Sequence, residues 1–116
     1  MNKIGIYTSK TIAQRSTYKR LRQNLMEEKR LTRVVLDILK PHEPHLTEFA
    51  EYLCSLDEIE RLEITVIERD ETTETLEAVI NGDINYDGLR LHMAVKGAAI
   101  HSVDEVTVSQ ISSTHD

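Results

Sequence analysis

The sequence is poor in residues that mark several protein classes: its 116 residues include one cysteine, two prolines, four glycines, one phenylalanine and no tryptophan. A single cysteine, Cys54, excludes an internal disulfide bond and a zinc site built from several cysteines. No apolar run approaches the roughly 20 residues that span a bilayer. The opening "MNKIGIYTSK" lacks the apolar stretch of a secretory signal. We therefore expect a cytoplasmic, single-domain protein with no membrane partner.

Charge is distributed unevenly along the chain. Residues 1–30 carry eight Lys and Arg against Glu27 and Glu28, a net charge of +6. The remaining residues carry six basic and 18 acidic groups, a net charge of −12. We therefore predict a basic arm at 1–30, an acidic domain at 31–108 and a flexible tail at 109–116.

Three interpretations of the arm stay open. Tyr18, Leu21 and Leu25 can share one face of a weak amphipathic helix that binds nucleic acid or another anionic surface. Alternatively, the arm docks on the acidic domain of its own or a neighbouring chain. In the third interpretation it is a disordered upstream extension, because Met26 opens "MEEKRLTRVVLDILK", a natural start for the domain.

Hydrophobic periodicity predicts the first elements of the domain. "RVVLDILK" at 33–40 has branched apolar residues on both faces, which is typical of a central strand. A helix follows and ends near Leu56, with Pro44 at its first position. Its apolar stripe consists of Leu46, Phe49, Ala50 and Leu53. Two alternating runs joined by "DETTE" predict a β-hairpin, and their buried residues are Leu62, Ile64 and Val66, then Leu76, Ala78 and Ile80.

The rest of the domain completes a known pattern. "NGD" at 81–83 should interrupt the chain before a second helix, with Asn85 as N-cap, Lys96 as last residue and Gly97 after it. "AIHSVDEVTV" at 99–108 supplies a fourth strand. The order βαββαβ predicts an α+β, ferredoxin-like sandwich, a four-stranded antiparallel sheet with two helices on one face. Right-handed crossovers place strands one and three in the centre, with strand four beside strand one.

Three segments also resemble the domain of unknown function 211 family (DUF211): "VVLDILKPHEP" at 34–44, "LDEIERLEITVIERDETTETLEAVINGDINYD" at 56–87 and "GAAIHSVDEV" at 97–106. The resemblance covers about residues 31–108 and implies small, mostly archaeal proteins with a ferredoxin-like fold. It also implies assembly into multi-subunit rings and no known reaction. Gly88 departs from the family, which commonly has an acidic residue there that completes a capping box with Asn85.

The stretch "PHEPH" raises the possibility of a divalent metal ion as cofactor. His42 and His45 are three residues apart with Pro44 between them, so they do not form a zinc-protease helix. Strand four runs antiparallel to strand one, which brings His101 toward His42 and His45 with Glu43 as an oxygen donor. Three imidazoles and a carboxylate suit zinc or a similar ion. The alternative is a rigid joint between strand and helix, with Glu43 favoured by the helix dipole.

A second candidate metal site is acidic. Asp37 interrupts an apolar strand, and Asp104 and Glu105 lie on the strand expected beside it. On a shared face they would bind calcium or magnesium, or pair with a basic residue of another subunit. The alternative is that they are ordinary polar residues of a partly exposed sheet. The alternation in "AIHSVDEV" does not determine the face.

Other chemistry is disfavoured by missing residue types. The predicted strands contain no aromatic residue for base stacking, and they carry Glu63, Glu68 and Glu77, so the acidic domain is not a nucleic-acid platform. A CxxC motif for copper is absent. We expect Cys54 to be packed beside the helix stripe and not to act as a nucleophile, and no serine lies in a Gly-rich elbow. The sequence favours a protein that is not an enzyme.

Surplus apolar residues favour association with itself as the partner. Val35, Leu39, Ile67 and Val79 fall on the sheet face away from the helices, and the second helix has two apolar stripes. One stripe contains Tyr86, Leu89 and Met93, and the other contains Leu91 and Val95. An isolated domain buries only one of these stripes, so we predict a homo-oligomer that acts as a binding or regulatory module.

Overall fold

The computed structural model describes residues 29–110, of which Leu31–Ser109 form one compact unit. The elements follow the predicted βαββαβ order: β1 (Lys29–Pro41), α2 (Leu46–Cys54), β2 (Ile59–Arg69), β3 (Thr73–Ile84), α3 (Tyr86–Val95) and β4 (Ala99–Gln110). Neither helix in this part of the chain is long and apolar enough to cross a membrane.

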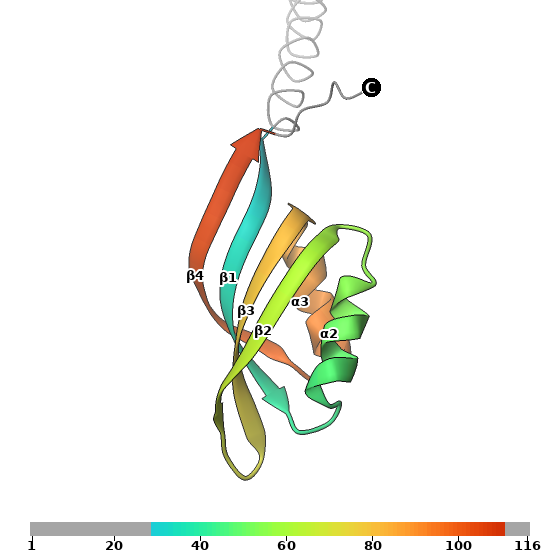
Figure 1. Ribbon diagram of the computed structural model, residues 1–116, viewed down its shortest axis with the longest axis vertical. Helices are drawn as coiled ribbons and strands as arrows, with labels where there is room; N and C mark the ends of the chain where they lie inside the picture. The colour runs from blue at the N-terminus through green and yellow to red at the C-terminus, as the bar shows by residue number, and fades with distance from the viewer. Residues whose placement is uncertain (1–28, 111–116) are drawn as a thin grey trace, which may run out of the picture. The chain divides into compact units, whose positions relative to one another are not determined.

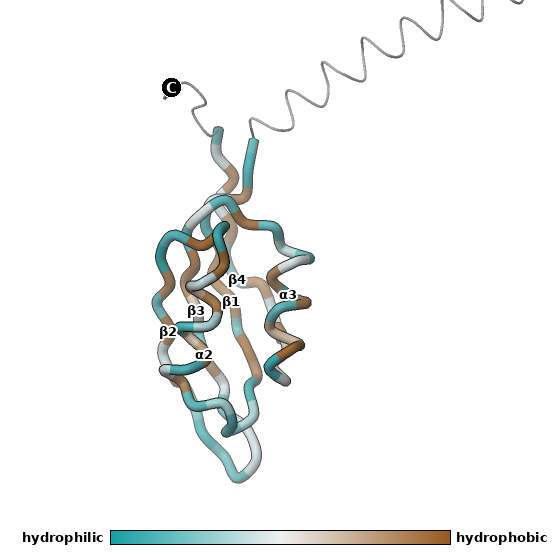
Figure 2. The backbone as a smooth tube through the Cα atoms, turned by 90° about the vertical axis from the view of Figure 1, so that its right-hand side faces the viewer, coloured by the Kyte–Doolittle hydropathy of each residue, from teal (hydrophilic) through white to brown (hydrophobic). Residues whose placement is uncertain are grey.

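The strands form one sheet in the order β2-β3-β1-β4, which confirms the predicted ferredoxin-like topology. The central strand β3 pairs antiparallel with both β1 and β2. Both helices lie on the same face of the sheet (Figures 1 and 2), so within residues 29–110 no helix covers the opposite face. At one end of the sheet, β1 and β4 extend together past β2 and β3 (Figure 1).

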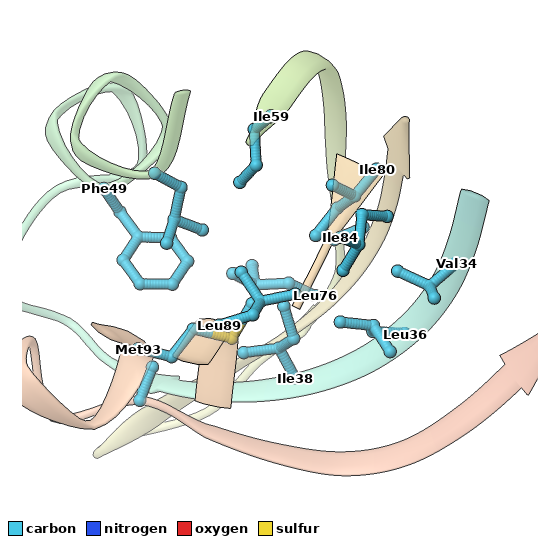
Figure 3. Packing of buried hydrophobic residues seen from close by; sticks show 13 residues of the cluster. Val34, Leu36, Ile38, Phe49, Ile59, Leu76, Ile80, Ile84, Leu89 and Met93 are labelled. Atoms are coloured by element: carbon cyan, nitrogen blue, oxygen red, sulfur yellow. The ribbon is translucent and has the colours of Figure 1, made fainter. Parts of the chain in front are cut away.

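The core lies between the helices and the inner face of the sheet. Side chains of both helices and of β1, β2 and β3 point into the same space (Figure 3). The predicted inward residues of the hairpin lie in this core. Leu76, Ala78 and Ile80 of β3 are fully buried, and Leu62, Ile64 and Val66 of β2 are partly buried and pack against the core. Each fully buried leucine or isoleucine contributes about 1.5–3 kcal/mol through removal of apolar surface from water.

The strands are longer than predicted. The hairpin loop contains only residues 70–72, because Asp70 N–H donates to Thr73 O and the Asp70 carboxylate accepts from Thr72 and Thr73 N–H groups. The predicted five-residue loop was therefore wrong. The expected interruption at 81–83 was also wrong, since β3 continues through Gly82 to Ile84 with a register shift against β2 between Ile59 and Arg61.

The helices begin and end close to the predicted residues, with one difference. Helix α2 starts at Leu46 with His45 as N-cap, so Pro44 precedes the helix and is not its first residue; the Glu43–Pro44 peptide is cis. Helix α3 has the predicted N-cap: Asn85 Oδ1 accepts from Gly88 N–H at 3.0 Å. Gly97 follows the helix with φ of +79°, a conformation that favours glycine.

Gly82 provides a direct test of the close approach of β3 to the chain before β2. A Cβ atom added at Gly82 would lie well inside van der Waals contact with the backbone oxygen of Glu58, whose position is fixed because it accepts from Asp83 N–H at 2.9 Å. We expect Gly82→Ala to lower the free energy of unfolding by more than about 2 kcal/mol in urea denaturation. Gly88→Ala is the matched control, because its Cβ meets only Asn85 at 3.4 Å. Equal effects of the two substitutions would contradict this explanation.

Candidate functional site

Lys40 is buried because of its position in the alternation of β1. Val34, Leu36 and Ile38 point under the helices and are fully buried, and Lys40 is the next residue on that face. Its side chain has no accessible surface, although lysine is almost never fully buried unless it is paired. A buried ammonium group requires oxygen partners to replace water.

Those partners come from the "PHEPH" segment and from β3. Lys40 Nζ donates to the carbonyl oxygens of Pro41, at 2.7 Å, and of Pro44, and it lies 3.5 Å from the carbonyl of His42. Its charge partner is Glu74, which sits opposite Lys40 in the β1–β3 register, with Oε1 3.2 Å from Nζ. The ammonium group therefore holds the chain between β1 and α2 in one path.

Glu74 connects this joint to the base of the hairpin. Its carboxylate is buried, and Oε2 accepts from Arg69 Nε at 3.0 Å. Burial raises the pKa of Glu74, but the hydrogen bonds and positive charges of Arg69 and Lys40 outweigh burial, so its pKa lies below the usual range. The carboxylate is therefore ionised at neutral pH and compensates the buried charge of Lys40.

His42 and Asp70 extend the same network toward the hairpin loop. His42 Nδ1 lies 3.4 Å from Glu74 Oε2, and its Nε2 lies 2.9 Å from the backbone oxygen of Asp70. The N–H groups of Thr73 and Thr72 hydrogen-bond the Asp70 carboxylate and hold its pKa below the usual range. "PHEPH" thus links β1, α2 and the β2–β3 hairpin, as expected of a rigid joint.

The sequence contained a signal for this network that our interpretation of "PHEPH" missed. Lys40 continues the apolar face of β1, and Glu74 falls on the inward parity of Leu76 and Ala78. Two opposite charges at inward positions of neighbouring strands predict a buried ion pair. The predicted metal site instead used His42, Glu43 and His45 of this segment as ligands, together with His101.

The structure does not bring the predicted histidine ligands together within one chain. His42 faces Glu74, whereas Glu43 and His45 are exposed and lie 3.8 Å apart. His101 is exposed on the other face of the sheet, because Ile100 before it packs against the core. No group of three His, Cys, Asp or Glu residues within residues 29–110 is arranged to hold a metal ion. Metal binding by these residues stays a prediction.

The three residues of the acidic candidate site each have a different neighbour. Asp37 is half-buried opposite Glu77 of β3, and Glu105 accepts from Arg33 Nη1 at 2.8 Å. Asp104 accepts from Ser102 Oγ at 2.9 Å. Glu105 thus pairs with a basic residue of its own chain, whereas the alternative was a basic residue of a neighbouring subunit.

Apolar side chains on three surfaces are exposed. On α3, Leu89 and Met93 of one stripe are buried, whereas Leu91 and Val95 of the other stripe are 59% and 72% exposed. Of the four apolar residues predicted on the sheet face away from the helices, Leu39 and Ile67 are exposed, Val79 is half-buried, and Val35 is buried. The third surface is β4, where Val103, Val106 and Val108 are all exposed.

Cys54 corrects a prediction about packing. We expected it to be buried beside the apolar stripe, but it is exposed. It is the last residue of α2, one position past Leu53, which is the last buried residue of that stripe. A rotation of one residue around the helix is enough to turn its side chain away from the core.

Two comparisons bear on this unit of four strands and two helices. The family model DUF211, described as "Uncharacterized ArCR", matches residues 32–112. A curated protein of Methanocaldococcus jannaschii, described as "Uncharacterized protein MJ0319", is 42% identical over 81 residues, which cover 69% of this chain and 84% of that protein. The family match includes the whole joint around Lys40 and both sheet edges.

The buried ion pair can be measured by a double-mutant cycle. Lys40→Met leaves Glu74 buried without its ammonium partner and removes the donor to three carbonyls, so we expect a loss of about 3–5 kcal/mol in the free energy of unfolding. Adding Glu74→Leu should recover part of this loss, because no buried charge is then left unpaired. Lys96→Met, which removes a charge 4.6 Å from the Tyr52 ring, is the control and should cost under about 1 kcal/mol. Strict additivity of the Lys40 and Glu74 substitutions would contradict the coupling.

The lowered pKa of Glu74 predicts how stability depends on pH. A carboxylate with a lowered pKa in the folded state stabilises that state above its unfolded pKa of about 4.3, and this contribution is lost as the pH falls further. Urea denaturation between neutral pH and pH ~3 should therefore show a steeper loss for the wild type than for Glu74→Gln. Glu77→Gln, an exposed glutamate of the same strand, is the control and should follow the wild type. Parallel curves for wild type and Glu74→Gln would exclude this role.

Proposed function

Since this chain belongs to the DUF211 family, we propose that it is a cytosolic, self-assembling module that works by binding and regulation and is not an enzyme. The observation that carries this proposal is the number of exposed large hydrophobic side chains. Within residues 29–110 they are Leu39, Ile67, Leu91, Val95, Val103, Val106 and Val108. Six of the seven lie on α3, β4 or, for Leu39, the sheet face away from the helices; Ile67, which was predicted beside Leu39, lies at the register shift of the edge strand β2 between Val66 and Glu68.

The arrangement of these residues is more typical of a subunit interface than of isolated exposed apolar side chains. Leu91 and Val95 are one helical turn apart on α3, so they form a continuous stripe. Val106 and Val108 are two residues apart on β4, so their side chains share one face. Contiguous exposed apolar residues on different surfaces are typical of subunit interfaces.

A rigid scaffold favours binding at fixed surfaces. The joint around Lys40 and Glu74 fixes the path from β1 into α2 and ties it to the hairpin. The β1–α2 joint is therefore preorganised, and interfaces that form without rearrangement lose less entropy on association.

Native mass spectrometry of the full chain tests the proposal. We expect one discrete oligomer at micromolar protein concentration, because several exposed apolar surfaces gain from mutual burial. Gel filtration across a range of concentrations should give the same assembly. A monomer in both measurements would overturn the proposal.

The same spectrum tests the predicted divalent metal. A stoichiometric mass excess that His42→Ala or His101→Ala removes would support a metal site formed when chains assemble. An oligomer with no excess mass after gentle desalting in added zinc would leave these histidines without a metal role.

A further inference from the structure

The two edges of the sheet differ in how they are protected against pairing. Edge strands expose unpaired backbone N–H and C=O groups, and proteins commonly block them with charged residues or irregular pairing. The edge strand β2 has both: its pairing with β3 shifts register twice, and it carries Glu60, Arg61, Glu63, Glu68 and Arg69. Extension of the sheet from β2 is therefore disfavoured.

The other edge strand, β4, carries far fewer charged residues than β2. Its twelve residues contain no Lys, Arg, Pro or Gly, and three of them are exposed valines. Its charged residues are Asp104 and Glu105, next to each other in the middle of the strand. Glu105 is already paired with Arg33, and Asp104 accepts from Ser102. A strand of this kind is a template for one more strand.

The charges of β4 restrict how two copies of it can pair. Antiparallel pairing about a two-fold axis keeps the helices of both copies on one face of a continuous sheet. Because side chains alternate, only residues of the same face can then be opposite each other. An axis at Asp104 or Glu105 puts like carboxylates directly opposite, which is unfavourable.

An axis at Val103 avoids this repulsion and adds complementary pairs. Residues 99–107 of the two copies then overlap, with Val103 opposite its own symmetry mate. On the same face, Glu105 lies opposite His101 of the second copy, so a carboxylate faces an imidazole. On the helix face, exposed Val106 lies opposite the partly buried Ile100, which extends the core across the junction.

We propose that β4 is the interface for a second copy of this chain, which pairs antiparallel with β4 about a two-fold axis at Val103. This inference rests on the proposed self-assembly and specifies one of its contacts. The contact leaves Leu91 and Val95 on α3 uncovered, so they remain available to join such pairs into a larger assembly. An interface of this kind is isologous, with the same residues contributed by both copies.

Cysteine cross-linking tests the register directly. In a Cys54→Ser background, which has no other cysteine, Val103→Cys places two thiols opposite each other at the axis, within about 5.5 Å between Cβ atoms. We expect a disulfide-linked dimer under mild oxidation. Val106→Cys in the same background is the matched control. Its symmetry mate is six residues along the strand, roughly 20 Å away, so it should remain unlinked.

A charge substitution tests the interface without a new covalent bond. Val103→Lys puts two ammonium groups at the axis and should weaken association by at least about tenfold, as measured by analytical ultracentrifugation. Ile67→Lys on the other edge strand is the control and should associate as the wild type, since Ile67 is even more exposed than Val103. Circular dichroism verifies that both variants fold.

The outcomes separate this inference from the proposed function. A monomeric wild type removes both. An oligomeric wild type in which Val103→Cys stays unlinked, or in which Val106→Cys links equally well, overturns the β4 pairing and leaves self-assembly intact. A Val103→Cys chain that cross-links only to a cysteine placed in β2 would show a head-to-tail contact instead, and would also overturn it.

Discussion

The inward face of β1 is the constraint on which the rest of the structure depends. Val34, Leu36 and Ile38 fill the space under the two helices, and the strict alternation of a strand then places Lys40 under them as well. A lysine ammonium cannot be buried there without oxygen partners. Glu74 on the neighbouring strand and the carbonyls of "PHEPH" supply them, so the apolar pattern of one strand determines the geometry of the following joint.

The same alternation explains why the outer surfaces are apolar in places. Among residues 29–110, the four-stranded sheet has helices on one face only, and its two edges pair with no further strand. At β2 the exposed positions are filled mainly by charged residues, whereas at β4 they include three valines. The asymmetry between the two edges is chemical and not topological, because strand order alone treats them alike.

Most of the fold was predictable because it depends on local patterns. The two alternating runs of the hairpin, the stripe ending at Leu53 and the cap at Asn85 are each visible in a few neighbouring residues. One error occurred where a distant segment intervened, and another where a single side chain closes a loop. Gly82 continues β3 because the backbone around Glu58 lies against it, and the hairpin loop is short because the Asp70 carboxylate closes it.

The sequence by itself determined the order of elements, the sheet topology and the inward residues, since periodicity and handed crossovers leave few alternatives. It also carried the family resemblance. Only the tertiary structure decided what "PHEPH" does, because its oxygen atoms are backbone carbonyls, which the side-chain sequence does not specify, and their partner is a lysine from the strand before. The sequence likewise left open which residues of β4 face the helices. In the structure Ile100 packs against the core, and His101 is exposed on the other face.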